Sequence, residues 1–228
     1  MEKPKVIQVL MPVYKQLSSR SFVSFWDLMW YLRNNYEVYM NFVENTLIGH
    51  ARDELLKKVV ENHRTNKIDY VLWLDSDHIY TIEAFEALRK DIDQYGLDMV
   101  SALYFSRKSN DEITPVMMVK SQTANKYNAI YEIPENKLMK VDVAGFGYLM
   151  MKPDVLIDVY ATYPEPFNIQ LEEYDEAVGE DILFLEKAKK LGYDIWVDTG
   201  VVVRHVGGSI GMDNYLLHRT NKGEMRKW

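Results

Sequence analysis

The first half of the chain alternates between short apolar segments and longer segments with a helical period. The apolar segments predict strands at Val6–Met11, Tyr36–Val43, Asp69–Leu74 and Asp98–Tyr104. The segments between them predict helices at Phe22–Asn34, Ile48–Arg64 and Thr81–Tyr95. Strands separated by helices of this length imply an α/β fold with a mostly parallel sheet and helices on its faces.

Capping residues support these helix boundaries. Ser18 or Ser19 and Thr81 stand where an N-cap hydroxyl is expected, and Gly96 stands where the third helix should end. In the second helix, apolar residues recur at spacings of three and four, which indicates one buried face. These residues are Ile48, Ala51, Leu55 and Val59.

The second half has a different organisation. Three extended pieces, "TPVMMVK", "YNAIYEI" and "LMKVDVAGFGYLMM", lie close together in the sequence, so we expect antiparallel or mixed strands added to the sheet. A loop rich in Tyr and Pro, "YATYPEPFN", then leads to a helix over Glu180–Leu191, which Gly192 ends. Tyr193–Val203 predicts the last strand, and the tail from Gly207 to Trp228 shows no clear periodicity.

Composition excludes several classes of protein. A chain of 228 residues can bury one large core, so we expect a single domain. The net charge of -7 argues against general nucleic-acid binding, which needs a basic face. The absence of cysteine excludes disulfides and thiolate metal sites. No signal peptide and no apolar run of membrane-spanning length is recognisable, so a cytoplasmic protein is the favoured interpretation.

Two acids follow the third predicted strand directly, as Asp75-Ser76-Asp77. Residues i and i+2 of a strand point the same way, so two carboxylates would meet at a strand end and repel each other. A hard divalent cation such as Mg²⁺ or Mn²⁺ would relieve this repulsion. Alternatively, the two side chains bond to local amides in an ordinary turn.

Two further features of the sequence are weaker indications of a functional site, because each has an ordinary structural explanation. The pair Glu180-Asp181 opens a predicted helix, where acids commonly compensate the helix dipole. His205 lies among valines on the last predicted strand, where a histidine is usually part of the core or of a sheet edge.

Several stretches in this order together resemble the nucleotide-sugar glycosyltransferases of the GT-A fold, especially the family 2 type. They are "MPVY", "GHARDELL", "YVLWLDSDH", "VAGFGYLMM" and "GEDILFLEKAKKLGYDIWVDTGVVVRH". The resemblance covers Val6–Gly208 and implies a GT-A, Rossmann-like domain over residues 1–208. Its nucleotide-binding half would be about 1–105 and its acceptor-binding half about 106–208, with 209–228 as a tail that could close as a lid.

The resemblance also implies a metal site. The family's D-x-D motif falls on Asp75, which would face the ribose or the metal shell, and on Asp77, which would bind the metal. His205 matches a third ligand in many relatives and would favour Mn²⁺ over Mg²⁺. The family often has an acid where this chain has His78, so we expect His78 behind the ligands or at the surface.

Donor-binding residues follow from the resemblance in the same way. Pro12 and Tyr14 match the loop that borders the nucleotide base, and Tyr14 would stack there or simply pack. Arg52 would hold the nucleotide side of the donor, or else be an exposed helix charge in an ion pair. Glu44, or the adjacent Asn45, would contact the base, although this loop departs from the usual "DDGS". Gly145 would line the donor sugar, or mark a bulge.

The family's "ED" motif places the catalytic base at Asp181 and leaves Glu180 to position acceptor or donor. The implied reaction moves a sugar from a UDP- or GDP-sugar to a glycan or another hydroxyl acceptor, with inversion, although retention stays open. Aromatic residues of the second half could form an acceptor wall, or an ordinary surface loop. They are Tyr160, Tyr163, Phe167 and Tyr174.

Two other functions stay open at this point. One is a nucleotidyltransferase on a similar α/β sheet, although no Gly-rich basic phosphate loop follows the first strand. The other is a protein that binds a nucleotide sugar without catalysis. The sequence also leaves open whether the chain forms a homo-oligomer.

Overall fold

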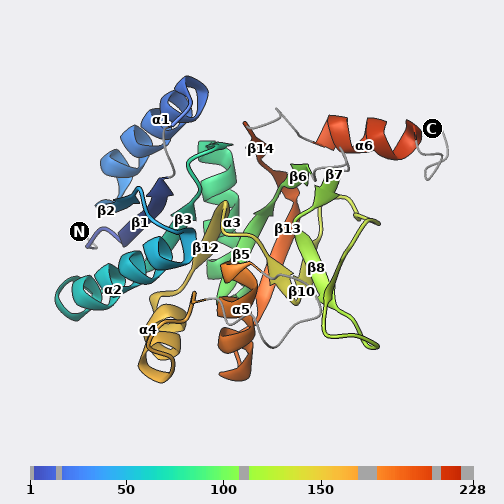
Figure 1. Cartoon of the computed structure of the whole chain (residues 1–228). Helices are drawn as coiled ribbons and strands as arrows, with labels where there is room; N and C mark the ends of the chain where they lie inside the picture. The colour runs from blue at the N-terminus through green and yellow to red at the C-terminus, as the bar shows by residue number, and fades with distance from the viewer. Residues whose placement is uncertain (1–2, 14–16, 108–112, 169–178, 207–211, 222–228) are drawn as a thin grey trace.

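The computed structural model describes residues 3–13, 17–107, 113–168, 179–206 and 212–221. A seven-stranded sheet in the order β10-β13-β5-β12-β3-β1-β2 forms the centre (Figure 1). Five strands run in one direction: β1 (Val6–Val13), β2 (Glu37–Glu44), β3 (Tyr70–Leu74), β5 (Met99–Leu103) and β13 (Ile195–Val202). Two strands run against them, β12 (Tyr148–Met151) and β10 (Leu138–Val141). The predicted α/β fold with a mostly parallel sheet is confirmed.

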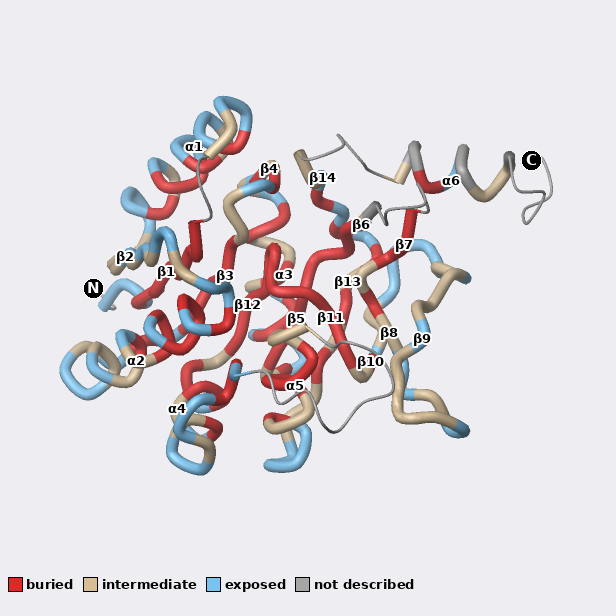
Figure 2. Tube along the Cα trace, in the orientation of Figure 1, coloured by how far each residue is buried: buried red, intermediate tan, exposed pale blue. Residues whose placement is uncertain are grey.

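Helices cover both faces of this sheet. On one face lie α2 (Ile48–Asn66), α4 (Pro153–Thr162) and α5 (Glu180–Lys190), and on the other lie α1 (Ser19–Asn35) and α3 (Ile82–Tyr95). Each layer has its own cluster of buried apolar side chains, and Figure 2 shows the burial concentrated in the strands between them. None of the helices in the described part of the chain is both long and apolar enough to cross a membrane.

The prediction that antiparallel strands of the second half join the sheet is confirmed for β10 and β12, whereas the other short strands form small separate antiparallel sheets. They form the sets β11 (Val143–Ala144), β8 (Met117–Lys120) and β9 (Tyr127–Ala129); β6 (Phe105–Arg107) and β7 (Ile113–Pro115); and β4 (His78–Ile79) and β14 (Arg204–His205). The pairing of β4 with β14 brings the segment after β3 to the segment after β13.

The predicted caps are present. Ser18 accepts a hydrogen bond from the backbone N–H of Ser21 at 3.0 Å, and Thr81 accepts one from Ala84 at 3.1 Å. Gly96 ends α3 with a φ of 68°, a backbone conformation that glycine adopts without a Cβ clash.

Two helices differ from the sequence prediction. The predicted Tyr- and Pro-rich loop begins inside α4, whose buried residues Val155, Leu156 and Val159 keep the helical spacing. The prediction was wrong because it took the aromatic residues, rather than this short apolar period, as the signal. The tail contains α6 (Met212–Asn221), which docks through the buried Tyr215 stacked on Phe105 at 4.8 Å. Among the described side chains of α6, Met212 also packs against the core and Arg219 lies over the ring of Tyr131.

Candidate functional site

The predicted site residues gather at the carboxyl edge of the parallel strands. Asp75 directly follows β3, and Tyr104 directly follows β5. His205 lies on β14, just beyond the end of β13, and its partner in the ladder is His78. The backbone N–H of Val206 also donates to the carbonyl of Asp77 at 2.6 Å. Because parallel strands end at the same edge, segments distant in the sequence meet there.

Asp77 lies between two imidazoles. Its Oδ1 is 3.0 Å from Nδ1 of His78, and its Oδ2 is 3.0 Å from Nε2 of His205. Burial alone would raise the pKa of Asp77, but the hydrogen bonds with His205 and His78 outweigh it and hold that pKa far below its usual range. The same hydrogen bond to Asp77 raises the pKa of His205, against the opposing effect of burial. The carboxylate is therefore ionised and fixed in orientation.

Arg52 joins the two predicted acid pairs. Its Nη2 is 2.9 Å from Oδ1 of Asp75, and its Nη1 is 3.4 Å from Oε1 of Glu180. The guanidinium also lies 4.8 Å from the ring centre of Phe146. Arg52 is only 3% exposed, so the interpretation as an exposed helix charge is wrong, although the expected ion pair exists. Its Nε has no hydrogen-bond partner among the described residues, so this buried donor is unsatisfied in the structure.

Asp181 lies in the first turn of α5, beside this group. Burial raises its pKa to about 6; the charge of Arg52 opposes that rise, and the charge of Glu180 adds to it. Its Oδ1 accepts the backbone N–H of Ile182 at 2.8 Å. A Cβ built on Gly179 would lie 2.7 Å from the same oxygen, so the glycine leaves room for the carboxylate. The result is a carboxylate held on a helix and ready to accept a proton near neutral pH.

Close contacts fasten α2 to the start of α5. A Cβ on Gly49 would lie 2.6 Å from the backbone oxygen of Phe167 and 3.5 Å from Cβ of Glu180, so only glycine fits. One turn later, Asp53 accepts the backbone N–H of Phe167 at 3.1 Å. The stretch "GHARDELL" therefore sets the distance between Arg52 and Glu180.

Two aromatic side chains occupy the space around the glycines of "VAGFGY". A Cβ on Gly145 would overlap the hydroxyl of Tyr104, and one on Gly147 would lie 2.6 Å from Cε1 of His78. Tyr104 packs edge-on against His78, with ring centres 4.5 Å apart. His78 is buried, so its expected place behind the ligands fits and a surface position does not. Contact of Gly145 with a donor sugar stays a prediction.

Sequence reasoning missed Tyr104. It is buried, and burial, reinforced by the charges of Asp75 and Asp181, raises the pKa of its phenol. The phenol therefore stays protonated near neutral pH. Its position directly after a predicted strand, at the edge that carries the D-x-D motif, was an available signal.

The other predicted donor residues lie at the same edge of the sheet. Pro12 is buried near the end of β1, opposite Val43, and Glu44 is exposed at the end of β2. Tyr14 lies outside the described residues. Asn45 follows with a φ of 58°. These positions are compatible with a binding site for a nucleotide base and do not test it.

The predicted aromatic wall is wrong in part. Phe167 is fully buried and stacks on Phe184 at 4.5 Å, so its ring cannot meet an acceptor. Tyr160 and Tyr163 are half-buried against the same core. Tyr174 lies outside the described residues. The short sequence "PEPF" looked like a surface loop because burial of Phe167 depends on partners distant in the sequence.

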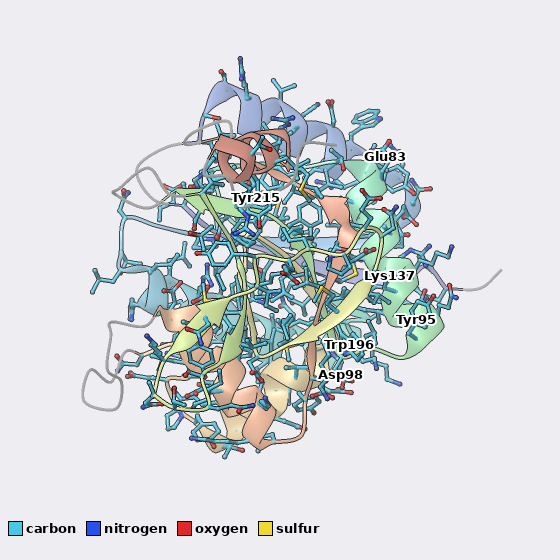
Figure 3. All side chains as sticks on the ribbon, turned by 90° about the vertical axis from the view of Figure 1, so that its right-hand side faces the viewer. Glu83, Tyr95, Asp98, Lys137, Trp196 and Tyr215 are labelled. Atoms are coloured by element: carbon cyan, nitrogen blue, oxygen red, sulfur yellow. The ribbon has the colours of Figure 1, made fainter. Side chains whose placement is uncertain are left out.

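A cleft of about 830 Å³ opens between α6, β13 and the loop that precedes β10. Its lining combines the rings of Tyr131 and Tyr215 with Glu132, Glu135, Asn136 and Arg219. Thr199 accepts the backbone N–H of Lys137 at 2.9 Å and so holds this loop against β13. Figure 3 views the molecule from this side and labels Tyr215, which belongs to α6. The volume and the mixed lining are typical of a small-molecule site.

The donors at the carboxyl edge suit a divalent cation. Asp77 and His205 already converge, and Mg²⁺ or Mn²⁺ commonly takes one or two protein ligands and completes its shell with phosphate oxygens and water. Within the described ranges, no three His, Cys, Asp or Glu side chains form a ready-made metal cluster. Asp75 is directed to Arg52 instead. These residues therefore fit a cation that shares its shell with a diphosphate.

Comparisons with known proteins identify the fold. No family model matches the chain, and no curated protein matches it. Among solved structures, it is similar to A197 from STIV, with a TM-score of 0.53 and 15% identity over 87% of this chain and 84% of that one. It is also similar to GalNAc-T7, solved with UDP, GalNAc and Mn²⁺, with a TM-score of 0.54 and 9% identity over 89% of this chain and 43% of that one. This chain thus matches less than half of GalNAc-T7, and at these identities the likeness shows the GT-A fold alone.

Proposed function

We propose that this protein is a metal-dependent glycosyltransferase, related to the family 2 type, that uses a nucleoside-diphosphate sugar. One observation carries the proposal: a buried arginine joins the acid after β3 to the acid that opens α5, beside a carboxylate with a raised pKa. Asp181 is half-buried, and strongly shifted carboxyl pKa values cluster at functional sites. The GT-A fold and the Mn²⁺ and UDP in the GalNAc-T7 structure add support.

In this proposal the donor lies along the carboxyl edge, with its base near Pro12 and Glu44 and its diphosphate near Asp77. Asp77 and His205 would hold Mn²⁺ or Mg²⁺, which acts as a Lewis acid toward the leaving diphosphate. Arg52 keeps Asp75 oriented for the ribose and would place its positive charge on the nucleotide side of the donor. Glu180 is held by the same guanidinium and can position the sugar or the acceptor.

Asp181 is the proposed general base. It removes the proton of the acceptor hydroxyl while that oxygen bonds to the anomeric carbon and the bond to the diphosphate breaks on the opposite side, which inverts the configuration. A base works best when its pKa lies just below the working pH, and a value of about 6 meets this condition. Gly179 and the N–H of Ile182 fix its direction.

The cleft beside α6 is the proposed acceptor site. Val202 lines it and lies three residues before His205, so the two Cα atoms are at most about 11 Å apart. Carboxylates, an amide and tyrosine rings suit a neutral glycan, whose hydroxyls bond in the plane of the ring and whose C–H faces pack on aromatics. This position replaces the acceptor wall that included Phe167.

Ligand stabilisation followed by product analysis tests the function. The melting temperature is measured with UDP, GDP, CDP and their sugars, with and without Mn²⁺, because a ligand at 100 times its Kd adds about 2.7 kcal/mol. Incubation of the stabilising sugar nucleotide with a glycan panel should then release the nucleoside diphosphate. Release of pyrophosphate from a nucleoside triphosphate would indicate a nucleotidyltransferase instead, and binding without turnover would indicate a non-catalytic protein.

A further inference from the structure

One helix carries two apolar faces. The face of α1 toward the sheet buries Phe25, Leu28, Met29 and Leu32. Phe22, Trp26 and Trp30 follow one another at intervals of four residues on another side, and they are 53%, 60% and 67% exposed. Apolar side chains at this spacing form one continuous stripe on a helix. Because the core does not use this stripe, its large aromatic residues need another explanation.

The stripe continues onto the edge strand of the sheet. The hydroxyl of Tyr31 donates to Glu86 of α3, which identifies the flank of α1 that faces α3. The stripe lies on another flank, and on the β2 side the exposed Phe42 packs edge-on against Phe25 of α1, with ring centres 5.9 Å apart, while Met40 is also exposed. We call these residues the aromatic face: Phe22, Val23, Trp26, Trp30, Met40 and Phe42. Figure 1 places α1 and β2 together at one end of the molecule, and Figure 2 shows the outer side of α1 exposed.

The area of this face matches one side of a protein interface. At about 200 Å² for each aromatic side chain, the exposed parts of its two Trp and two Phe residues amount to roughly 440 Å². A standard interface buries about 800 Å² per partner, of which about 57% is apolar, or roughly 450 Å². The aromatic face therefore supplies the apolar part of one complete partner surface.

Its shape is complementary to itself. Phe22, Val23 and Trp26 surround a shallow hollow of about 280 Å³. Trp30 projects one turn further along, about 12 Å from Phe22 along the axis. If two α1 helices pack antiparallel about a twofold axis near Trp26, then Trp30 of each copy meets the hollow of the other. A twofold interface requires this reciprocity, in which residue i contacts j and j contacts i.

The charges of α1 argue against a lipid surface as the occupant. The helix carries Arg20 and Arg33 with Asp27. Anionic membranes are usually recognised by clusters of about 4–8 Lys or Arg residues. The chain as a whole has a net charge of -7, which such a membrane would repel.

We infer that the aromatic face is the interface of a homodimer in which two α1 helices pack antiparallel. The inference is independent of the proposed function, because it rests on the far end of the sheet from β13 and α6. It assigns the exposed Trp26 and Trp30 to recognition of a second copy of this chain. It also covers the open edge of β2, which would otherwise be available for strand pairing.

Sedimentation equilibrium of the full chain and of two variants tests the inference. The wild type should be dimeric at micromolar concentration. Trp30→Glu should weaken association at least 100-fold, because a hot-spot residue is lost twice in a symmetric interface. Tyr95→Glu, which changes a 57% exposed residue on α3, should leave the dimer intact. Both variants should keep the far-UV spectrum of the wild type, since neither side chain is in the core.

Three results would overturn the inference. They are a wild type that stays monomeric up to 100 µM, roughly a hundred times the range expected here; a dimer that Trp30→Glu does not weaken; and a monomer that sediments with vesicles of phosphatidylcholine and phosphatidylglycerol through Trp30. The last result would assign the same face to a lipid surface. None of these measurements depends on glycosyl transfer, so failure here leaves the proposed function unaffected.

Discussion

Replacing Asp181 with Asn should make the protein more stable at alkaline pH and less active at the same time. Burial raises the pKa of Asp181 from 3.8 to about 6. A raised carboxyl pKa favours the folded state at low pH, and this contribution is lost as the pH rises through 3.8 to about 6. At about 1.36 kcal/mol per pKa unit, keeping the carboxylate ionised in the folded state costs about 3 kcal/mol. Asn has the same shape, can accept the N–H of Ile182 and never ionises.

Urea denaturation at pH 5 and pH 8 measures this cost. The free energy of unfolding of Asp181→Asn, relative to the wild type, should rise by about 1.4 kcal/mol between the two pH values, the part of the linkage that falls in this window. For a chain of this size that corresponds to about 3–6 °C in Tm. Transfer should fall by about 10²–10⁴, and wild-type activity should rise with pH through a midpoint near 6.

Asp154→Asn is the matched control. Asp154 also lies in the first turn of a helix, α4, but it is exposed. Its replacement should cost about 0.3–1 kcal/mol through the helix dipole and give no stability gain at pH 8. The reasoning is refuted if the stability difference between Asp181→Asn and the wild type is the same at both pH values, or if the variant keeps full activity.

Three further predictions concern other parts of the site. Asp77→Ala should abolish Mn²⁺-dependent binding of the donor in calorimetry with and without the metal; unchanged binding would remove Asp77 from the metal site. Arg52→Met should lower the free energy of unfolding by about 3 kcal/mol, the lower end for a broken buried ion pair because Asp75 and Glu180 keep some solvent contact. It should also shift the pH midpoint of activity above 6, because the charge of Arg52 lowers the pKa of Asp181. Arg64→Met, at an exposed position, is the control, and a pH midpoint that does not move in Arg52→Met would contradict the coupling. Val202→Trp should raise the acceptor KM at least tenfold, roughly the effect of 1.4 kcal/mol, without changing the rate of donor hydrolysis. Val119→Trp is the control, because Val119 is a strand residue of similar exposure outside the cleft, and it should change neither quantity. Equal acceptor KM values for the two variants would place the acceptor elsewhere.

Local signals made much of the fold predictable. The caps at Ser18 and Thr81 and the C-terminal Gly96 act within one turn of the helix they bound, so the sequence alone locates them. The carboxyl end of β3 was equally clear, because an uninterrupted apolar run meets Asp75. The resemblance then joined this strand end to His205, which no local pattern could do.

Properties that depend on distant partners were not predictable. Arg52 could be placed on a helix, but its burial requires the start of α5, which packs against Gly49. Phe167 looked exposed because its neighbours in sequence are Pro and Glu, yet it stacks on Phe184. The phenol of Tyr104 fits into the site because residue 145 is a glycine, whose lack of a side chain leaves room for it. Each of these outcomes depends on contacts between residues far apart in the chain.

The insertion of β12 between β3 and β5 has a consequence for folding during synthesis. The ladder on one side of β12 joins Leu149 to Trp73, and the ladder on the other joins Leu149 to Ser101. A ribosome that has released only the first 105 residues, about the length expected for the nucleotide-binding half, exposes β3 and β5 with a missing strand between them. Open strand edges of this kind favour pairing with other nascent chains. The strands of the first 105 residues therefore cannot form one continuous sheet before Met151 of β12 has emerged.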